Sequence, residues 1–176
     1  MNKQPLRLKR SHQLILNIAM FQLVWFACIL GGNLWALAVT PLLVLWHRTL
    51  LQPGEWQLIT AYLLAGAVLD TLLIGSGQLQ LANHQGPLLP YWLWLLWGAF
   101  ATTLLHSLHW LVLRRNALIV AGGLLAPLSY YTGAQLQQAT LTTLGLLVIG
   151  LQWAILMALT HVVVIRRTAQ QAEGES

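Results

Sequence analysis

Charged side chains are scarce in this sequence. Only 7% of its 176 residues are charged, and only four of those are acidic, whereas soluble domains carry about 25% charged residues. Hydrophobic residues make up 57% of the chain. A chain so poor in charge cannot cover a surface that faces water. We therefore expect lipid to surround most of it.

Several motifs that would point to a known chemistry are also missing. Cys28 is the single cysteine, which excludes an intramolecular disulfide and a CxxC metal or redox motif. The sequence has no P-loop, GxSxG, HExxH or dinucleotide-binding fingerprint. It also lacks the His-rich box of membrane desaturases and the Arg spacing of voltage sensors. These absences lower the expectation for several classes of enzyme and channel.

The apolar residues gather in six long runs, and crossing a bilayer takes about 20 residues as a helix. Backbone amides in lipid must be bonded within the segment, so we expect helices. The runs show no alternation with period 2, which argues against a small outer-membrane barrel. The sequence therefore predicts an all-α, polytopic transmembrane helical bundle that forms a single membrane domain over residues 1–176. The six expected spans are residues 14–30, 34–51, 56–74, 89–111, 117–132 and 141–165.

The basic residues indicate the orientation. The second run is short and contains Pro41, but if it crosses the membrane, all nine Lys and Arg residues lie on one side. Cytoplasmic loops carry such an excess of basic residues, so we expect a multi-pass membrane protein with both termini in the cytoplasm. The first run is longer than the apolar region of a signal peptide, about 7–15 residues, and is expected to be retained.

Asp70 is an acid inside the third expected span. A carboxylate near the bilayer centre costs about 2.5–3.5 kcal/mol on insertion scales, so an acid there suggests a function. Its expected partners are Thr71 nearby and a hydroxyl of the fifth span, namely Ser129, Tyr130 or Tyr131. Two interpretations stay open: a contact to a proton or a substrate, and a residue that only supports helix packing.

The fourth expected span carries a polar stripe. Thr103, His106, Ser107 and Trp110 have the i, i+3, i+4, i+7 spacing of one helical face. His106 is expected just beneath the inner membrane surface, where it can act as a general base or proton relay or simply bond to a neighbouring helix. His106 and His109 are three residues apart, but no acid within a span is expected at their depth. We therefore expect neither a metal site nor a cofactor.

The fifth expected span contains Pro127, which kinks a helix because it lacks a backbone donor. The kink, together with Ser129 and Tyr130, can line a small site near Asp70. A packing kink with interfacial tyrosines is the other interpretation.

Two stretches resemble the DUF2878 family of bacterial integral membrane proteins. They are FATTLLHSLHWL at residues 100–111 and GLLAPLSYYTGA at residues 123–134. Asp70 with Leu72, Leu73 and Gly75 is similar to a third marked segment of that family. The resemblance implies an inner-membrane protein close to lipid metabolism, because the family is associated with genes for fatty-acid modification. It transfers no catalytic residue. The positions that match the family's marked ones are Asp70, Thr103, His106, Ser107, Trp110, Pro127, Ser129, Tyr130 and Gly133.

Three functions follow as alternatives. The first is an accessory component linked to membrane lipid modification. The second is a small proton-linked transporter or lipid-handling protein that uses Asp70, and the third is a membrane-embedded enzyme that uses His106. The expected partners are membrane lipid, a lipid-modifying enzyme or a second copy of the chain, and no nucleic acid.

Overall fold

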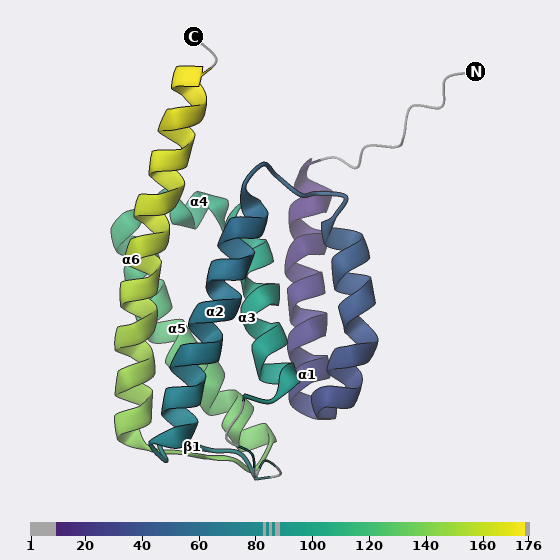
Figure 1. Cartoon of the computed structure of the whole chain (residues 1–176), viewed down its shortest axis with the longest axis vertical. Helices are drawn as coiled ribbons and strands as arrows, with labels where there is room; N and C mark the ends of the chain where they lie inside the picture. Colours follow the sequence, from purple (N-terminus) through teal and green to yellow (C-terminus); the bar gives the residue numbers. More distant parts are fainter. Residues whose placement is uncertain (1–9, 83, 85, 87–88, 175–176) are drawn as a thin grey trace, which may run out of the picture.

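The protein is a bundle of α-helices. The structure, a computed structural model, describes residues 10–82, 84, 86 and 89–174, the side chains of 171–174 excepted. Figure 1 shows the long helices running roughly alongside one another, with a small two-stranded ribbon at the end opposite the start of α1 and the C-terminal end of α6. The all-α class is as predicted. The elements are α1 (Arg10–His47), α2 (Glu55–Gly75), β1 (Leu79–Gln80), α3 (Tyr91–Leu104), α4 (His109–Val112), α5 (Arg115–Leu136), β2 (Thr140–Leu141) and α6 (Thr143–Gly174).

Helix α1 is folded back on itself at Gly32. This residue has φ 55° and ψ −143°, a conformation that glycine adopts without the steric cost of a Cβ. Figure 1 shows the two arms side by side and antiparallel, so the first two apolar runs form a helical hairpin. The second arm ends at His47, and residues 48–50 form a turn. The prediction that helix continues to residue 51 is therefore wrong.

The predicted fourth span, residues 89–111, is not one helix. Helix α3 has 14 residues, which is a length of about 21 Å at 1.5 Å per residue. A turn at residues 105–108 separates it from α4. Within the described residues, four helices are long and apolar enough to cross a membrane, namely α1, α2, α5 and α6.

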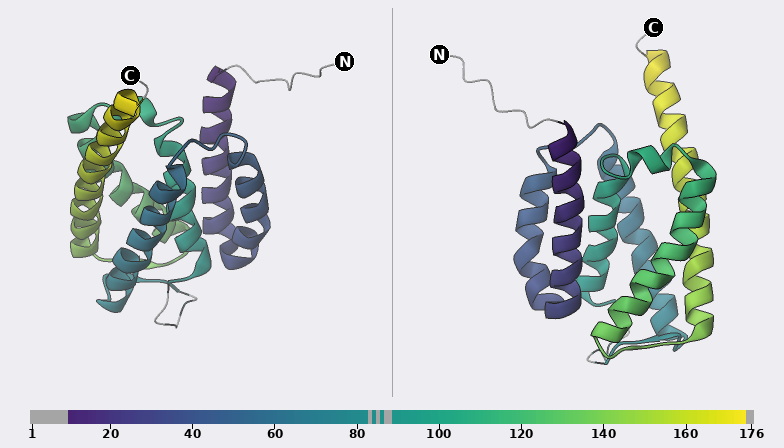
Figure 2. Two further views of the ribbon diagram at one scale, coloured as in Figure 1. Left: turned by 45° about the horizontal axis from the view of Figure 1, so that its top comes forward. Right: turned by 180° about the vertical axis from the view of Figure 1, so that it is seen from behind.

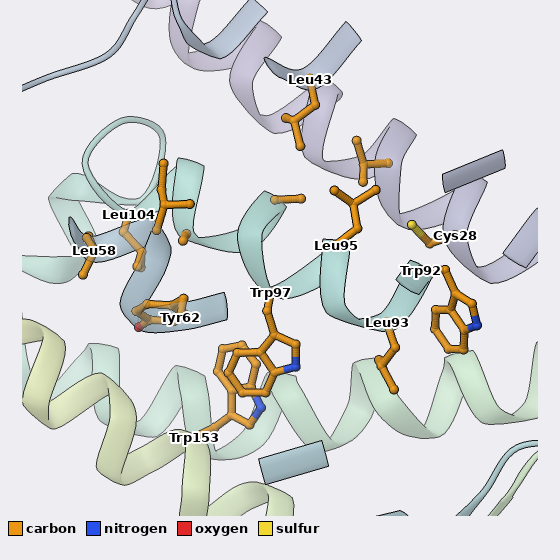
Figure 3. Packing of buried hydrophobic residues seen from close by; sticks show 14 of the residues in the cluster. Cys28, Leu43, Leu58, Tyr62, Trp92, Leu93, Leu95, Trp97, Leu104 and Trp153 are labelled. Atoms are coloured by element: carbon orange, nitrogen blue, oxygen red, sulfur yellow. The ribbon is translucent and has the colours of Figure 1, made fainter. Parts of the chain in front are cut away.

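Helix α3 lies in the middle of the bundle. It packs against α1 and α2, while α5 packs against α6. The rings of Trp97 on α3 and Trp153 on α6 stack with centroids 4.8 Å apart, and Figure 3 shows them face to face beside Tyr62. Gly66 of α2 permits this packing, because a Cβ there would lie 2.2 Å from the Trp97 ring. The aromatic core therefore joins three helices that are distant in sequence.

The outer surface of the bundle is apolar. Large side chains such as Leu34, Leu124 and Leu147 are 66–74% exposed. Exposed apolar surface on this scale is unusual for a soluble protein and suits contact with lipid. At one end, β1 and β2 pair antiparallel through Leu79 with Leu141 and Gln80 with Thr140. Figure 2 shows that the start of α1 and the C-terminal end of α6 lie at the opposite end.

Candidate functional site

Glu55 lies between two histidines that come from distant parts of the chain. Its Oε1 is 3.2 Å from Nε2 of His47 and 3.0 Å from Nε2 of His106. The His106 nitrogen is also 3.1 Å from Oε2. Glu55 is fully buried and His47 is 2% exposed. Three groups that can exchange protons or bind a metal ion thus share one enclosed space.

The local structure explains the position of Glu55. Helix α1 ends at His47, and the connection turns at Gly54, whose φ of 74° favours glycine. Glu55 is the first residue of α2, where the positive end of the helix dipole stabilises a carboxylate. The backbone N–H of Gln52 donates to Oε2 of Glu55 at 2.9 Å. The carboxylate is therefore held in one orientation.

Two further side chains hold this connection in place. The amide of Gln52 donates to the carbonyl oxygen of Leu105 at 3.1 Å, which ties the connection to the turn after α3. Arg167 of α6 donates to the carbonyl oxygen of Gly54 at 2.6 Å and to the side chain of Gln57 at 2.8 Å. The loop that carries Glu55 is thus anchored to two other helices.

His106 belongs to the turn that follows α3, and Asn17 of α1 holds that turn. The Asn17 amide donates to the carbonyl oxygen of Thr102 at 3.1 Å. Its Oδ1 accepts from the hydroxyl of Ser107 at 2.6 Å and from the Ser107 backbone N–H at 3.4 Å. Asn17 is 2% exposed, so these bonds replace those that water would otherwise make. The same bonds explain why the predicted helix over residues 89–111 is interrupted.

The interruption also separates the predicted polar stripe. The hydroxyl of Thr103 bonds locally to the carbonyl oxygen of Phe100, and Ser107 is engaged with Asn17. Trp110 is 56% exposed, and the Arg114 guanidinium lies 5.5 Å from the centre of its ring. These residues do not lie on one continuous helix. The neighbours of His106 therefore differ from the predicted ones. Among the four, His106 alone contacts Glu55 in the described structure.

A polar cavity of about 510 Å³ reaches His106. It lies at the same end of the bundle as the start of α1. The lining residues are Arg10, Gln13, Leu14, Thr49, Leu50, Gln52, Leu105 and His106. A small polar ligand or water therefore has a route to one member of the buried cluster.

Asp70 forms a second buried polar group. Its Oδ2 accepts the indole N–H of Trp97 at 2.7 Å. The hydroxyl of Tyr130 donates to Oδ1 at 2.8 Å and lies 3.0 Å from Oδ2. The predicted contact to Tyr130 is confirmed, whereas Ser129 instead accepts the indole N–H of Trp25 at 3.1 Å. Asp70 thus joins α2 to α3 and α5.

An apolar cavity of about 280 Å³ lies beside the Tyr130 side chain. Helices α1, α3, α5 and α6 contribute to its wall, together with residues next to β1 and β2. Aromatic rings form much of that wall, and Ser129, Tyr130 and Gln137 bring polar groups to it. Its aromatic lining residues are Phe21, Trp25, Trp92, Trp97, Phe100, Tyr130 and Trp153.

His47 and Glu55 are the two residues that sequence reasoning missed. The predicted spans placed His47 near the inner end of the second span, residues 34–51, and Glu55 just before the third, residues 56–74. The sequence did offer one signal for them: Glu55 and His47 are expected close to the same membrane surface as His106. The expectation concerned only acids within a span, and it therefore did not include Glu55, which lies at the start of α2 and points towards His106. His47, Glu55 and His106 also have the side chains that commonly ligate a metal.

The comparisons with known proteins match one family. The sequence model of the family described as "Protein of unknown function (DUF2878)" matches residues 14–159. Neither a curated protein nor a solved structure matches the chain. The matched range includes both polar clusters and most of the two cavities.

Proposed function

The chain belongs to the DUF2878 family, and we propose that it is a six-span inner-membrane protein that holds the acyl chain of a membrane lipid beside Tyr130. The observation that carries this proposal is the apolar cavity of about 280 Å³ with its aromatic wall. Binding pockets for small molecules have this character, mostly apolar with a few placed polar groups.

The arrangement of the helices supports six crossings. The two arms of α1 supply the first two, α2 the third, α3 with α4 the fourth, and α5 and α6 the last two. The start of α1, the α1–α2 connection, α4 and the C-terminal part of α6 lie at one end in Figure 1. These segments carry Arg10, Arg48, Arg114, Arg115, Arg166 and Arg167, whereas Lys3, Arg7 and Lys9 lie outside the described residues. The positive-inside rule assigns that end to the cytoplasm of a bacterium.

The chemistry of the cavity favours a hydrocarbon chain. Apolar cavities exclude water and bind apolar molecules, because water there would lose its hydrogen bonds. The cavity is partly open, and the surface of the bundle around it is apolar. Leu125, which lines the cavity, is 60% exposed, so the wall reaches the surface that we assign to lipid. An acyl chain can therefore enter sideways without crossing water.

Asp70 has a positioning role in this proposal. Its carboxylate accepts hydrogen bonds from Trp97 and Tyr130, and both of those side chains line the cavity. Asp70 itself is fully buried and is not among the lining residues. We therefore assign Asp70 the role of orienting the cavity wall, and not that of carrying protons across the membrane.

Ala126 offers a direct test. Ala126 lines the cavity, so Ala126→Phe is expected to fill it. The matched control is Leu128→Phe on the same helix, because Leu128 is 59% exposed and is absent from the cavity wall. Each protein is extracted in mild detergent, and the retained lipid per chain is measured by native mass spectrometry and by solvent extraction. We expect wild type and Leu128→Phe to keep a lipid that Ala126→Phe loses. Equal lipid in all three folded proteins would contradict the proposal.

A link to lipid modification extends the same proposal. A protein that holds an acyl chain can assist an enzyme that modifies such chains, either as its partner or by presenting lipid. Comparative lipid analysis of a deletion strain tests this link. We expect a changed fatty-acid profile that Ala126→Phe does not restore and Leu128→Phe does. An unchanged profile would exclude the link but leave the binding experiment above to decide on the cavity.

A further inference from the structure

The histidine–glutamate cluster contains a histidine that hydrogen bonding does not explain. His47 is 2% exposed, and within the described part of the chain neither of its ring nitrogens makes a hydrogen bond. Nε2 nevertheless lies 3.2 Å from Oε1 of Glu55. That distance is one of an ion pair, so Nε2 faces the carboxylate, whereas Nδ1 has no polar partner among the described residues. A buried polar atom without a partner is costly, and the crowding of two imidazoles on one carboxylate favours a ligand between them.

The distances suit a metal ion. One ligand atom from each of His47, Glu55 and His106 lies within 4.8 Å of the others. The two distances to Glu55 Oε1 are 3.0 and 3.2 Å. Tetrahedral zinc with bonds of about 2.0–2.1 Å separates its ligand atoms by about 3.3 Å. A small adjustment of the side chains would therefore admit the ion.

Neighbouring residues orient Glu55 and the turn that carries His106 through hydrogen bonds, as is usual around metal ligands. The Gln52 N–H bonds to Oε2 of Glu55, which leaves Oε1 to face the histidines. Asn17 holds the turn that carries His106 through Thr102 and Ser107. Such outer contacts orient metal ligands and raise the affinity of the site. The three ligands come from the end of α1, the start of α2 and the turn after α3, so the fold creates the site.

We propose that His47, Glu55 and His106 bind one divalent transition-metal ion of the zinc type. Two imidazoles and one carboxylate suit this class of ion, whereas Mg²⁺ and Ca²⁺ prefer oxygen ligands alone. Three protein ligands leave a fourth position for water or a substrate. The polar cavity that His106 lines gives water or a small substrate access to the cluster. This site is separate from the apolar cavity and stands whether or not a lipid is bound there.

An ion pair without metal is the competing account. A protonated His106 bonded to Glu55 would need no further ligand. That account leaves His47 at 3.2 Å from the same carboxylate oxygen that His106 already pairs, without a hydrogen bond among the described residues. The metal accounts for both histidines, and the two accounts differ in a measurable way.

The first experiment counts metal. The full chain is purified in detergent without a histidine tag, equilibrated with Zn²⁺ and freed of excess ion, and the zinc per chain is measured. We expect one Zn²⁺ per wild-type chain. Binding in a competition assay with a chromophoric chelator should weaken by at least about tenfold in His47→Gln, Glu55→Gln and His106→Gln. The controls are His12→Gln and His109→Gln, whose histidines lie outside the cluster, and they should bind as wild type does. Absence of Zn²⁺ from the wild type would overturn the proposal, as would unchanged affinity in the three cluster variants.

A second experiment remains informative if a cluster variant fails to fold. Co²⁺ replaces Zn²⁺ in the wild type, and its visible absorption reports the geometry of the ligands. We expect the intense visible bands of a four-coordinate site with nitrogen and oxygen ligands. His47→Cys keeps a ligand at the same position and should add a thiolate-to-cobalt charge-transfer band. The weak absorption of six-coordinate Co²⁺ in the wild type would contradict the proposed site, as would a His47→Cys protein that binds Co²⁺ without the new band.

Discussion

The indole N–H of Trp97 donates to the carboxylate of Asp70 at 2.7 Å, and this bond joins α3 to the C-terminal half of α2. Trp97 also stacks on Trp153 of α6 at 4.8 Å. Tyr130 of α5 donates to the same carboxylate. Four helices are therefore connected through a single acidic side chain and a single indole. The wall of the apolar cavity depends on this connection, because Trp97, Tyr130 and Trp153 all line it.

Asp70→Asn should destabilise the protein. The amide keeps one acceptor but places an N–H₂ group where Trp97 and Tyr130 both donate, and leaving buried donors unsatisfied costs about 1–3 kcal/mol. We expect a lower midpoint of thermal unfolding in detergent. Tyr130→Phe removes one donor and leaves the Trp97 bond, so its effect should be smaller. The double variant should fall short of the sum of the single ones because the residues share one network. An Asp70→Asn protein as stable as wild type would show that the network does not hold the helices.

Gly66→Ala should also destabilise the protein. The added Cβ would lie 2.2 Å from the Trp97 ring, and overpacking of this kind typically costs about 1–3 kcal/mol. Gly75→Ala in the same helix is the control, because nothing lies within 4 Å of the added Cβ. The two variants are compared by thermal unfolding in detergent. Equal stability of Gly66→Ala and Gly75→Ala would mean that α2 and α3 do not approach as described.

Asn17→Ala tests the turn that carries His106. The substitution removes the bonds to Thr102 and Ser107, and an unsatisfied buried carbonyl or hydroxyl costs about 1–3 kcal/mol. We expect a lower unfolding midpoint and, in the folded fraction, a weaker affinity for Zn²⁺ because His106 is less well oriented. Asn33→Ala is a useful comparison. Asn33 also bonds a backbone N–H, that of Trp92 at 3.1 Å, but near the hairpin turn of α1. Asn33→Ala should lower stability while Zn²⁺ affinity stays unchanged.

Reporter fusions test the six crossings. A fusion after Arg48 or after Arg114 should report the cytoplasm, because these residues belong to the cation-rich end of the bundle. A fusion after Gln80 or after Gln138 should report the periplasm, since both lie near the β1–β2 ribbon at the other end. Reporter activity on both sides of the membrane is measured for each fusion. A periplasmic Arg48 would contradict the crossing assigned to the second arm of α1.

Local sequence patterns predicted the helices and several of their ends. Apolar runs separated by Gly31–Asn33 and by the outer loops anticipated the hairpin in α1 and the helices α2, α5 and α6, since helix formation in lipid follows from hydropathy and backbone bonding alone. The contact of Asp70 with Tyr130 could also be predicted from the sequence, because the possible partners of Asp70 must lie at the same depth in the membrane. Its second donor, Trp97, was not among the expected partners.

The end of α3 and the site around Glu55 could not be derived in that way. Hydropathy continues past Leu104, but Asn17 bonds the carbonyl oxygen of Thr102, which is 85 positions away, and the Ser107 hydroxyl, and these bonds favour a turn. Glu55 and His106 are 51 positions apart, and His47 joins them from the end of α1. Composition and periodicity report which segments are apolar and how deep a residue lies. Which side chains meet at a given depth depends on how the helices are rotated and packed, and that follows from the aromatic core and the buried hydrogen bonds of the whole bundle.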